Sequence, residues 1–526
     1  MKCIVKSKNN KLCQTINNYT NMSTANRVIK NSIYLYVRMA VSIIFSFFTT
    51  RILLQSLGAN DYGLYNVVAG TLSMLNFLSA SMSSATQRFI SHAEGEGDFK
   101  RIAEIFNNAV FLHRMMGWVV CAFFVLGGFV FFNGVLNIDA ERTVVAIAVY
   151  ACMIFSTVFA ITIAPYDAVL NAHENMKYYS LLGIADVLMK FVIAIMVMLC
   201  ENLDQLLLYG ILMAFESWLF RFITQRYCVK HYVEVREINR LKYVNKDTLR
   251  TMTSFAGWNL LNISSGMICL YGINIIVNHY FDTTVNAAIG VATQFTGVLM
   301  GVIQNMSKAL TPVLVKSEGA KNREKVLELS YKGCKFSYLL FAIICIPLIP
   351  CLPKILQLWL VDVPHYTYEF CIVMILSLLV EQACLFLQQT INAEGNIKEY
   401  SIYKFIFNLV PIPASIICFQ FYHDPTYAWI IRFVFFVLIG SIINIIFSIK
   451  NTGLKFTCFF NKAILPCLIL TVIITITSYL INHTGNFNFI VCYMLCIIII
   501  LPFVYVLGLD KNERGLIKGI LHRQKY

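Results

Sequence analysis

The stretch TRILLQSLGANDYGLYNVVAG (residues 50–70) places a short polar turn between two long apolar runs. Glycine and asparagine, which tolerate the left-handed backbone of tight turns, gather there from Gly58 onward. Asp61 is a good N-cap for a helix that starts a few residues later. The flanking runs, residues 32–54 and 64–88, each exceed the ~20 residues that a helix needs to cross a bilayer. The stretch therefore predicts a hairpin of two helices, whose turn marks one membrane face.

The composition extends this interpretation to the whole chain. Of 526 residues, 58% are hydrophobic and only 13% are charged, and the mean hydropathy is +0.67. A soluble domain would carry about 25% charged residues. The sequence therefore predicts an all-α, polytopic membrane protein whose immediate partner is the lipid bilayer. We attribute the net charge of +14 to membrane topology and expect no nucleic-acid partner.

Successive apolar runs predict fourteen transmembrane helices in all. Their predicted ranges are 32–54, 64–88, 104–132, 143–171, 177–200, 203–225, 252–280, 284–314, 330–352, 369–392, 399–421, 427–449, 462–482 and 488–509.

The basic residues predict which ends of these helices face the cytoplasm. With a cytoplasmic N-terminus, the two tails and the even-numbered turns carry 29 of the 42 Lys and Arg residues, counting Lys177 and Lys462 at helix edges. The opposite turns carry only Arg142 and Lys354. Because positive charge is retained on the cytoplasmic side, both termini are expected in the cytoplasm, including the basic tail of residues 1–31.

Two pairs of similar turns indicate an internal repeat. NAHENMKYYS (residues 171–180) matches NAEGNIKEYS (residues 392–401) at six of ten positions, with an offset of 221 residues. EGEGDFKRIAEI (residues 94–105) resembles EGAKNREKVLEL (residues 318–329), with an offset of 224. Nearly equal offsets predict a duplicated unit of six helices, with both copies in the same orientation.

This repeat divides the chain into four parts. We expect a tail (1–31), an N-lobe with a basic linker (32–250), a C-lobe (251–450), and helices 13 and 14 with the C-terminal tail (451–526).

Charged residues inside apolar helices are the candidate functional residues, because an ionised group at the bilayer centre costs at least ~2.5 kcal/mol. Arg38, Arg114 and Lys308 have no opposite charge nearby in sequence and are the best candidates for a cationic, substrate-binding cavity. Arg88 and Arg432 complete this candidate set, although snorkelling to the membrane surface is sufficient to explain Arg88. Guanidinium groups favour a substrate that carries phosphate. Ion pairs that merely hold helices together remain the alternative.

Acidic residues in the same helices are candidates for ion coupling. Asp186 and Lys190 are four residues apart and can pair on one helix face, whereas Glu216 and Arg221, five apart, match less well. Asp186, Glu216 and Glu381 are the candidates for carrying a proton or Na⁺. Asp167, two residues after a proline, is interpreted as part of a kinked helix end.

Motifs for other chemistry are missing from the sequence. It has no Gly-rich loop that could hold ATP and no histidine or cysteine spacing typical of metal ligands. We therefore expect no cofactor, no metal site and no enzymatic activity.

The segment NRVIKNSIYLYVRMAVSIIFSFFTTRILLQSLGANDYGLYNVVAG (residues 26–70) resembles the N-terminal signature of Wzx-type bacterial polysaccharide flippases, which export O-antigen and capsule units. That signature has an arginine in the first helix, here Arg38, and a pattern R-x-L-G-x-x-x-Y-G-x-Y. The pattern falls, with a longer spacing between its first two residues, on Arg51, Leu57, Gly58, Tyr62, Gly63 and Tyr65.

The resemblance implies the multidrug/oligosaccharidyl-lipid/polysaccharide exporter superfamily, two lobes in a V, and alternating access. It further implies an undecaprenyl-diphosphate-linked oligosaccharide as substrate, moved from the cytoplasmic to the periplasmic leaflet of a bacterial inner membrane. A polysaccharide polymerase and glycosyltransferases are the implied partners. The alternative is a cation-coupled multidrug exporter of the same superfamily. Such exporters usually have twelve helices, and helices 13 and 14 and the basic residues within the helices argue against this alternative.

Overall fold

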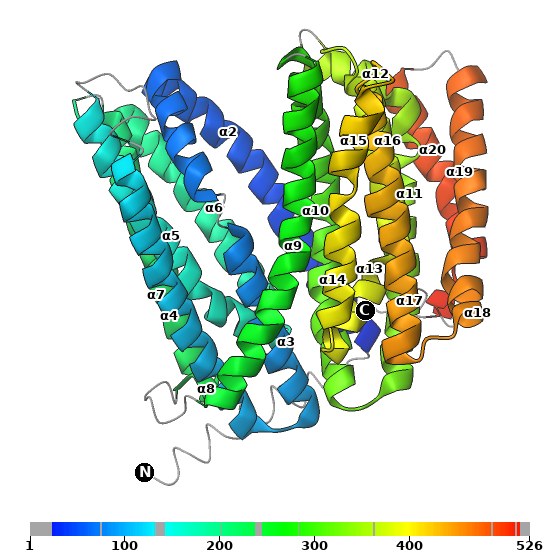
Figure 1. Cartoon of the computed structure of the whole chain (residues 1–526), viewed down its shortest axis with the longest axis horizontal. Coiled ribbons are helices and arrows are strands. Elements are labelled where there is room, and N and C mark those ends of the chain that lie inside the picture. Colours follow the sequence, from blue (N-terminus) through cyan, green and yellow to red (C-terminus); the bar gives the residue numbers. More distant parts are fainter. Residues whose placement is uncertain are drawn as a thin grey trace, which may run out of the picture.

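The computed structural model describes residues 24–73, 76–130, 132, 142–200, 202–236, 245–281, 283–360, 363–484, 488–510 and 513–515. Every regular element in these ranges is helical, as predicted. Figure 1 shows two helical bundles that stand side by side and diverge toward one end, with a further pair of helices beside the second bundle.

The first bundle, called the N-lobe here, contains the helices of the first half of the chain. They are α2 (Thr24–Ser73), α3 (Asn76–Glu96), α4 (Phe99–Val130), α5 (Thr143–Ala172), α6 (Met176–Leu199) and α7 (Gln205–His231), followed by the short α8 (Val233–Arg236). Within it α2 packs along α6 and α5 packs along α7.

The second bundle, the C-lobe, continues to residue 452. Its helices are α9 (Lys246–Tyr280), α10 (Thr283–Gly319), α11 (Arg323–Cys345), α12 (Leu348–Trp359), α13 (Thr367–Glu394), α14 (Lys398–Leu409), α15 (Pro411–Phe419), α16 (Thr426–Arg432), the π-helical η3 (Phe433–Ile439) and α17 (Gly440–Thr452). The boundary expected at residue 250 falls inside the first turns of α9.

The last helices form a separate layer on the C-lobe. They are α18 (Phe456–Phe459), η4 (Phe460–Ile464), α19 (Leu465–Thr484), α20 (Phe489–Phe503) and η5 (Val504–Gly508). Leu470 and Ile500 join an apolar cluster with Phe341 and Ile375 of the C-lobe. Lys335 of α11 is 2% exposed and bonds Glu513 at 2.7 Å, which fixes the segment of residues 513–515 to the C-lobe.

Twelve helical segments of the described ranges are long and apolar enough to cross a membrane, and α11 with α12, bent by 53°, would make a thirteenth. The predicted run 64–88 is not among them; it falls on the end of α2 and on α3, which is rich in Ser and Thr. The chain is a multi-pass membrane protein, and the count of fourteen stays a prediction.

The turn around Gly58 differs from the prediction in one respect. Gly58 has φ 72° and ψ 171°, which breaks α2, and helical backbone resumes directly after it. Asp61 therefore lies inside the first turn and does not cap a later helix, because the left-handed glycine alone reverses the chain. The Asp61 carboxylate bonds Arg142 at 2.9 Å, and Arg142 also bonds Asp204, the N-cap of α7. The turn is thus fixed to its own lobe by an ion-pair cluster.

The segments FKRIAEIF (residues 99–106) and REKVLELS (residues 323–330), which overlap the second pair of similar turns, are helical. Each forms the first turns of a longer helix, α4 and α11 respectively.

The two lobes meet at the end where α3, α5 and α10 terminate, which we call the closed end; it is the predicted cytoplasmic end (Figure 1). A Cβ atom on Gly95 would lie 2.1 Å from the Lys316 carbonyl oxygen, and one on Gly319 would lie 2.1 Å from the His92 carbonyl oxygen. The backbones of α3 and α10 are therefore in direct contact where the two helices end.

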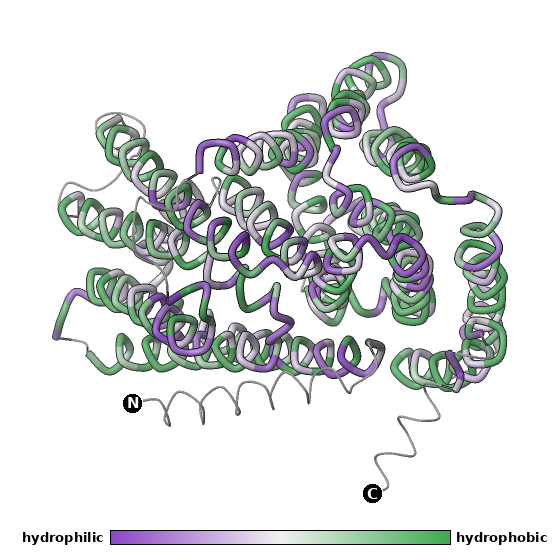
Figure 2. The backbone as a smooth tube through the Cα atoms, turned by 90° about the horizontal axis from the view of Figure 1, so that it is seen from below, coloured by the Kyte–Doolittle hydropathy of each residue, from purple (hydrophilic) through white to green (hydrophobic). Residues whose placement is uncertain are grey.

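The distribution of hydrophilic and hydrophobic residues follows the division into two lobes. Viewed from the closed end, hydrophilic residues gather between the lobes and hydrophobic residues cover most of the outer flanks (Figure 2). Large apolar side chains are among the exposed residues, for example Phe47, Trp118 and Phe129, each more than 70% exposed. Such a surface is suited to lipid and not to water.

Candidate functional site

Tyr179 of α6 lies between two cations that come from different lobes. The Arg38 guanidinium carbon of α2 is 4.6 Å from the centre of the Tyr179 ring. The Lys308 ammonium of α10 donates to the Tyr179 hydroxyl at 3.2 Å, and Lys308 remains exposed. Two of the three principal candidates are therefore brought together, although 270 residues separate them in sequence.

Gly183, one turn after Tyr179 on α6, makes room for Arg38. A Cβ atom at this position would lie 2.0 Å from the Arg38 Nε and 2.4 Å from its guanidinium carbon. No larger residue fits unless the arginine moves. The position of the guanidinium is thus set by a glycine that sequence patterns do not single out.

Asp167 belongs to the same group. It interacts electrostatically with both Arg38 and Lys308, and it lies five residues before the end of α5. Helix α5 continues through Pro165 and ends at Ala172, so Asp167 lies near a helix end as expected, but its interaction with the two cations was not predicted. The acid partly balances the two cations. We call Arg38, Asp167, Tyr179 and Lys308 the inter-lobe site.

The predicted pair of Asp186 and Lys190 is present, with 2.9 Å between the charged atoms. Glu216 of α7 does not pair with Arg221; its carboxylate lies 3.9 Å from Lys190 and its side chain is 3% exposed. Arg221 instead donates to Thr162 and Gln225. Two carboxylates thus share one ammonium group inside the N-lobe. Residue spacing within one helix cannot predict this arrangement, because Glu216 lies on a different helix.

Arg114, the third principal candidate, is not part of the inter-lobe site. It is exposed on α4 and interacts electrostatically with Tyr166, whose ring also lies 5.6 Å from the Arg221 guanidinium. No contact with Arg38 or Lys308 is present in the described structure.

The remaining candidates in the C-lobe form a group of their own. The Arg432 guanidinium lies over the rings of Trp429 and Phe436, at 5.3 Å and 4.5 Å. Glu381 interacts electrostatically with Arg432 and with Lys404, which is 8% exposed. Lys404 was not among the predicted candidates, although a lysine within the apolar run 399–421 is a visible signal.

Arg88 of α3 lies at the closed end and contacts the C-lobe. Its guanidinium donates to the carbonyl oxygens of Asn392, Ala393 and Glu394 at 2.6, 3.0 and 3.1 Å. These are the last carbonyls of α13, which a helix leaves without partners and where its dipole is negative. Arg88 therefore caps a helix of the opposite lobe.

A second set of charges joins the lobes beside Arg88. Lys316 of α10 bonds Glu94 at 2.9 Å and Glu174 at 3.1 Å, both from the N-lobe. His173 in turn contacts Glu94 and Glu234. Burial alone would lower the pKa of His173, but its hydrogen bonds to these carboxylates raise it to about 9. Burial would raise the pKa of Glu94, yet His173 and Lys316 lower it to about 2.

The chain is similar to one known protein family and to several solved structures. Residues 258–417 match the MatE family. This match lies within the C-lobe and covers less than half of the chain. The curated proteins contain no match.

Solved structures match a much larger part of the chain. An outward-facing multidrug-resistance MATE transporter of the MOP superfamily aligns with a TM-score of 0.70 and 14% identity, over 82% of this chain and 97% of that chain. A MATE protein in the straight conformation gives 0.69 and 14%, with the same coverage. A MOP superfamily transporter from Pyrococcus furiosus, described as having a binding pocket of reverse polarity, gives 0.70 and 13%, over 82% and 96%.

These matches establish that the chain has the MATE transporter fold, with two lobes as the resemblance implied. They do not support the polysaccharide and O-antigen specificity expected from the sequence, because the matched proteins are described as multidrug or MOP-superfamily transporters.

Proposed function

We propose that this protein is a cation-coupled exporter that works by alternating access between its N-lobe and C-lobe. The fold supports this proposal, and the outward-facing multidrug transporter among the matched structures favours the multidrug class over a polysaccharide flippase. The observation that carries the proposal is the group of Asp186, Lys190 and Glu216 within the N-lobe.

This group holds two carboxylates against one ammonium group. Because Glu216 is 3% exposed and Lys190 also bonds Asp186, the charge of one carboxylate has no full counterion among these groups. A buried uncompensated carboxylate is costly in a membrane, so a proton or Na⁺ that neutralises it would be bound favourably. Binding and release of that cation would alternate with the positions of the lobes.

The inter-lobe site would hold the substrate in this cycle. Tyr179 and Lys308 belong to different lobes, so a substrate that contacts both is sensitive to their relative position. A ligand can shift a conformational equilibrium only through such differential contacts.

A second candidate function is the flipping of a diphosphate-linked lipid oligosaccharide. The pair of Arg38 and Lys308 favours it, because two cations around one tyrosine are suited to phosphate oxygens and not to a cationic drug. The Pyrococcus furiosus neighbour, with a pocket of reverse polarity, suggests that this fold is compatible with pockets of either charge.

The experiment is transport in proteoliposomes with an imposed H⁺ or Na⁺ gradient. One assay follows efflux of ethidium and another follows flipping of a polyprenyl-diphosphate oligosaccharide. Gradient-driven ethidium efflux that is lost in Glu216→Gln supports the first candidate. Flipping that is lost in Arg38→Ala together with Lys308→Ala, without ethidium transport, supports the second. If the transport rates of both substrates do not change with the H⁺ or Na⁺ gradient, cation coupling is excluded.

A further inference from the structure

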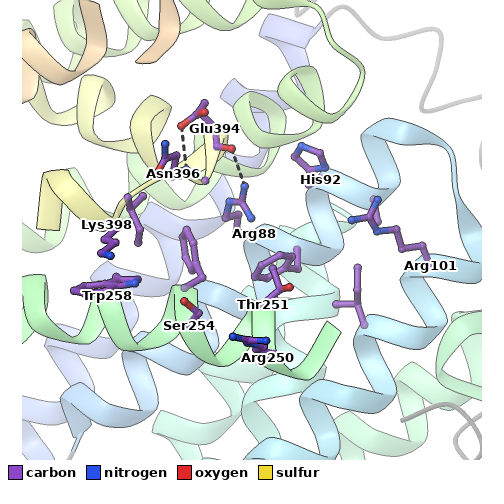
Figure 3. Close-up of a pocket in the computed structure, with 16 residues that line it drawn as sticks. Arg88, His92, Arg101, Arg250, Thr251, Ser254, Trp258, Glu394, Asn396 and Lys398 are labelled. Carbon is purple, nitrogen blue, oxygen red and sulfur yellow. Dashed lines mark hydrogen bonds between the residues drawn. The ribbon is translucent and has the colours of Figure 1, made fainter. Parts of the chain in front are cut away.

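A pocket of about 610 Å³ opens at the closed end, between the two lobes (Figure 3). Its walls come from α3, the start of α4, the first turns of α9, and the turn between α13 and α14. Its volume lies within the ~300–1,000 Å³ of small-molecule sites. The inter-lobe site contributes no residue to it.

The pocket is strongly basic. Arg88, Arg101, Arg250 and Lys398 line it, against Glu394 as the one carboxylate among its lining residues. Arg250 is exposed and has no hydrogen bond or ion pair in the described structure. The exposed Lys398 ammonium lies 5.6 Å from the centre of the Trp258 ring and interacts electrostatically with the adjacent Glu399, which is itself exposed and bonds Lys450. Two cations are thus available for an anion.

Uncapped backbone adds to this attraction. Helix α14 begins at Lys398, inside the pocket wall, and no side chain caps its first N–H groups. The N-terminus of a helix carries partial positive charge and N–H donors, which suit phosphate oxygens. Ser254, which is exposed in the wall, supplies a hydroxyl donor.

Aromatic residues form the rest of the wall. Phe89, Phe255 and Trp258 line the pocket, and Figure 3 shows Trp258 beside Lys398 and Ser254 beside Arg250. Phe89 and Phe255 also lie 4.8 Å from the Arg88 guanidinium, so their rings are held in place. An apolar surface next to free cations fits a ligand with an anionic head and an apolar body.

We propose that this pocket binds a phosphate-bearing amphiphile, with Arg250, Lys398 and the start of α14 on the phosphate and Trp258 on the apolar part. An anionic lipid headgroup at the inner leaflet and a soluble phosphate ester share this chemistry. Because both lobes line the pocket, the bound ligand also holds them together at the closed end. This site goes beyond the proposed transport function and does not depend on it.

The experiment measures binding in the full-length protein, purified in a neutral detergent. Melting temperature is followed while phosphatidylglycerol, phosphatidylcholine or inorganic pyrophosphate is added. Phosphatidylglycerol is expected to raise the melting temperature of the wild type. In Arg250→Ala with Lys398→Ala the apparent affinity should fall on the order of ten-fold or more, because two charge-assisted contacts are lost. Both side chains are exposed, so the variant is expected to fold.

The matched control is Lys455→Ala with Lys462→Ala, which removes two exposed charges outside the pocket. It should bind phosphatidylglycerol as the wild type does. An effect of phosphatidylglycerol without one of pyrophosphate identifies a lipid site, and the reverse identifies a soluble phosphate compound. The proposal is overturned if neither anion acts, if phosphatidylcholine acts equally, or if both double variants lose the same affinity.

Discussion

Tyr179 contacts a cation from each lobe, and its environment is set by a glycine. Arg38 approaches the ring only because position 183 carries no side chain. The Lys308 ammonium reaches the hydroxyl from the other lobe. Function at this site is therefore expected to depend on Gly183 as much as on the charged residues.

The first prediction follows from that geometry. In Gly183→Ala the new methyl group would overlap the Arg38 side chain, which is flexible and would turn away from Tyr179. Transport should fall by roughly ten-fold, the loss expected when one charge-assisted contact is removed. Transport rate and the amount of protein in the membrane are measured together. The control is Gly127→Ala, where a Cβ atom meets nothing within 4 Å. Equal transport in both variants would show that Arg38 is not needed where it lies.

The second prediction concerns His173, whose pKa is raised to about 9 from an ordinary value near 6.5. A group with a raised pKa contributes stability that is complete below its unfolded-state value and is lost as pH rises through its folded-state value. Glu94, with a pKa of about 2, stays ionised throughout this range. The melting temperature should therefore fall between about pH 6.5 and 9. His173→Gln should be less stable at the lower pH and should show a flatter pH profile.

His231→Gln serves as the control for this measurement. His231 is exposed on α7 and contacts Tyr227 rather than a carboxylate. An unchanged pH profile in His173→Gln would rule out the protonated histidine as the cause.

At the scale of elements, sequence patterns predicted what lies along one helix and missed what lies between helices. The apolar runs located most of the helices but not the one predicted at 64–88, and four-residue spacing located the pair of Asp186 and Lys190. The pairing of Glu216 with Arg221 that the sequence suggested is not formed, because Lys190 reaches Glu216 from a neighbouring helix. The contact of Lys308 with Tyr179 depends on how the lobes dock, which no local pattern encodes.

The third prediction tests the capping of α13 by Arg88. Arg88→Ala removes three hydrogen bonds and leaves the last carbonyls of α13, which are part-buried, without these donors, which should cost on the order of 3 kcal/mol. Arg88→Lys keeps the charge but not the branched donors and should recover only part of this loss. Chemical unfolding in detergent measures both. Arg101→Ala, which breaks an exposed pair with Glu96, should cost ~1 kcal/mol or less.

The fourth prediction concerns the anchor of the last helices. Lys335 and Glu513 are both buried, at 2% and 3% exposure, so removing Lys335 leaves an unpaired buried carboxylate, and removing Glu513 leaves Lys335 with only the exposed Asp510, 3.7 Å away. Glu513→Gln or Lys335→Met should each destabilise the protein by about 3–5 kcal/mol, and the double variant should lose less than the sum. Thermal unfolding of the wild type and the three variants gives the double-mutant cycle. Additive losses would mean that the two groups do not interact.

At the scale of the whole molecule, the lobes are joined by two reciprocal contacts. Arg88 from the second helix of the N-lobe bonds the last carbonyls of α13, and Lys316 from the second helix of the C-lobe bonds Glu174, in the turn after α5. Both contacts fall within the similar segments NAEGNIKEYS and NAHENMKYYS. A duplicated six-helix unit would produce such an arrangement, and the duplication itself stays a prediction.

The last prediction is that these reciprocal contacts keep the closed end shut. Lys316→Glu would place a third carboxylate against Glu94 and Glu174, so repulsion should separate the lobes there. Alternating access requires such a separation when the cytoplasmic side opens. Hydrogen–deuterium exchange should then become faster in the last turns of α10 and in the turn of residues 395–397. Exchange in α19, which belongs to the separate layer, should not change.

Reversing the charge of Glu174 in the Lys316→Glu variant gives the comparison that tests this prediction. In Lys316→Glu combined with Glu174→Lys the pair is restored with opposite signs, so exchange at the closed end should return toward the wild-type rate, although the repulsion from Glu94 keeps the recovery partial. Slow exchange in the single variant would contradict the prediction. The closed end would then be held by apolar contacts, such as the cluster of Ala85, Phe255 and Ile397, which charge reversal does not disturb.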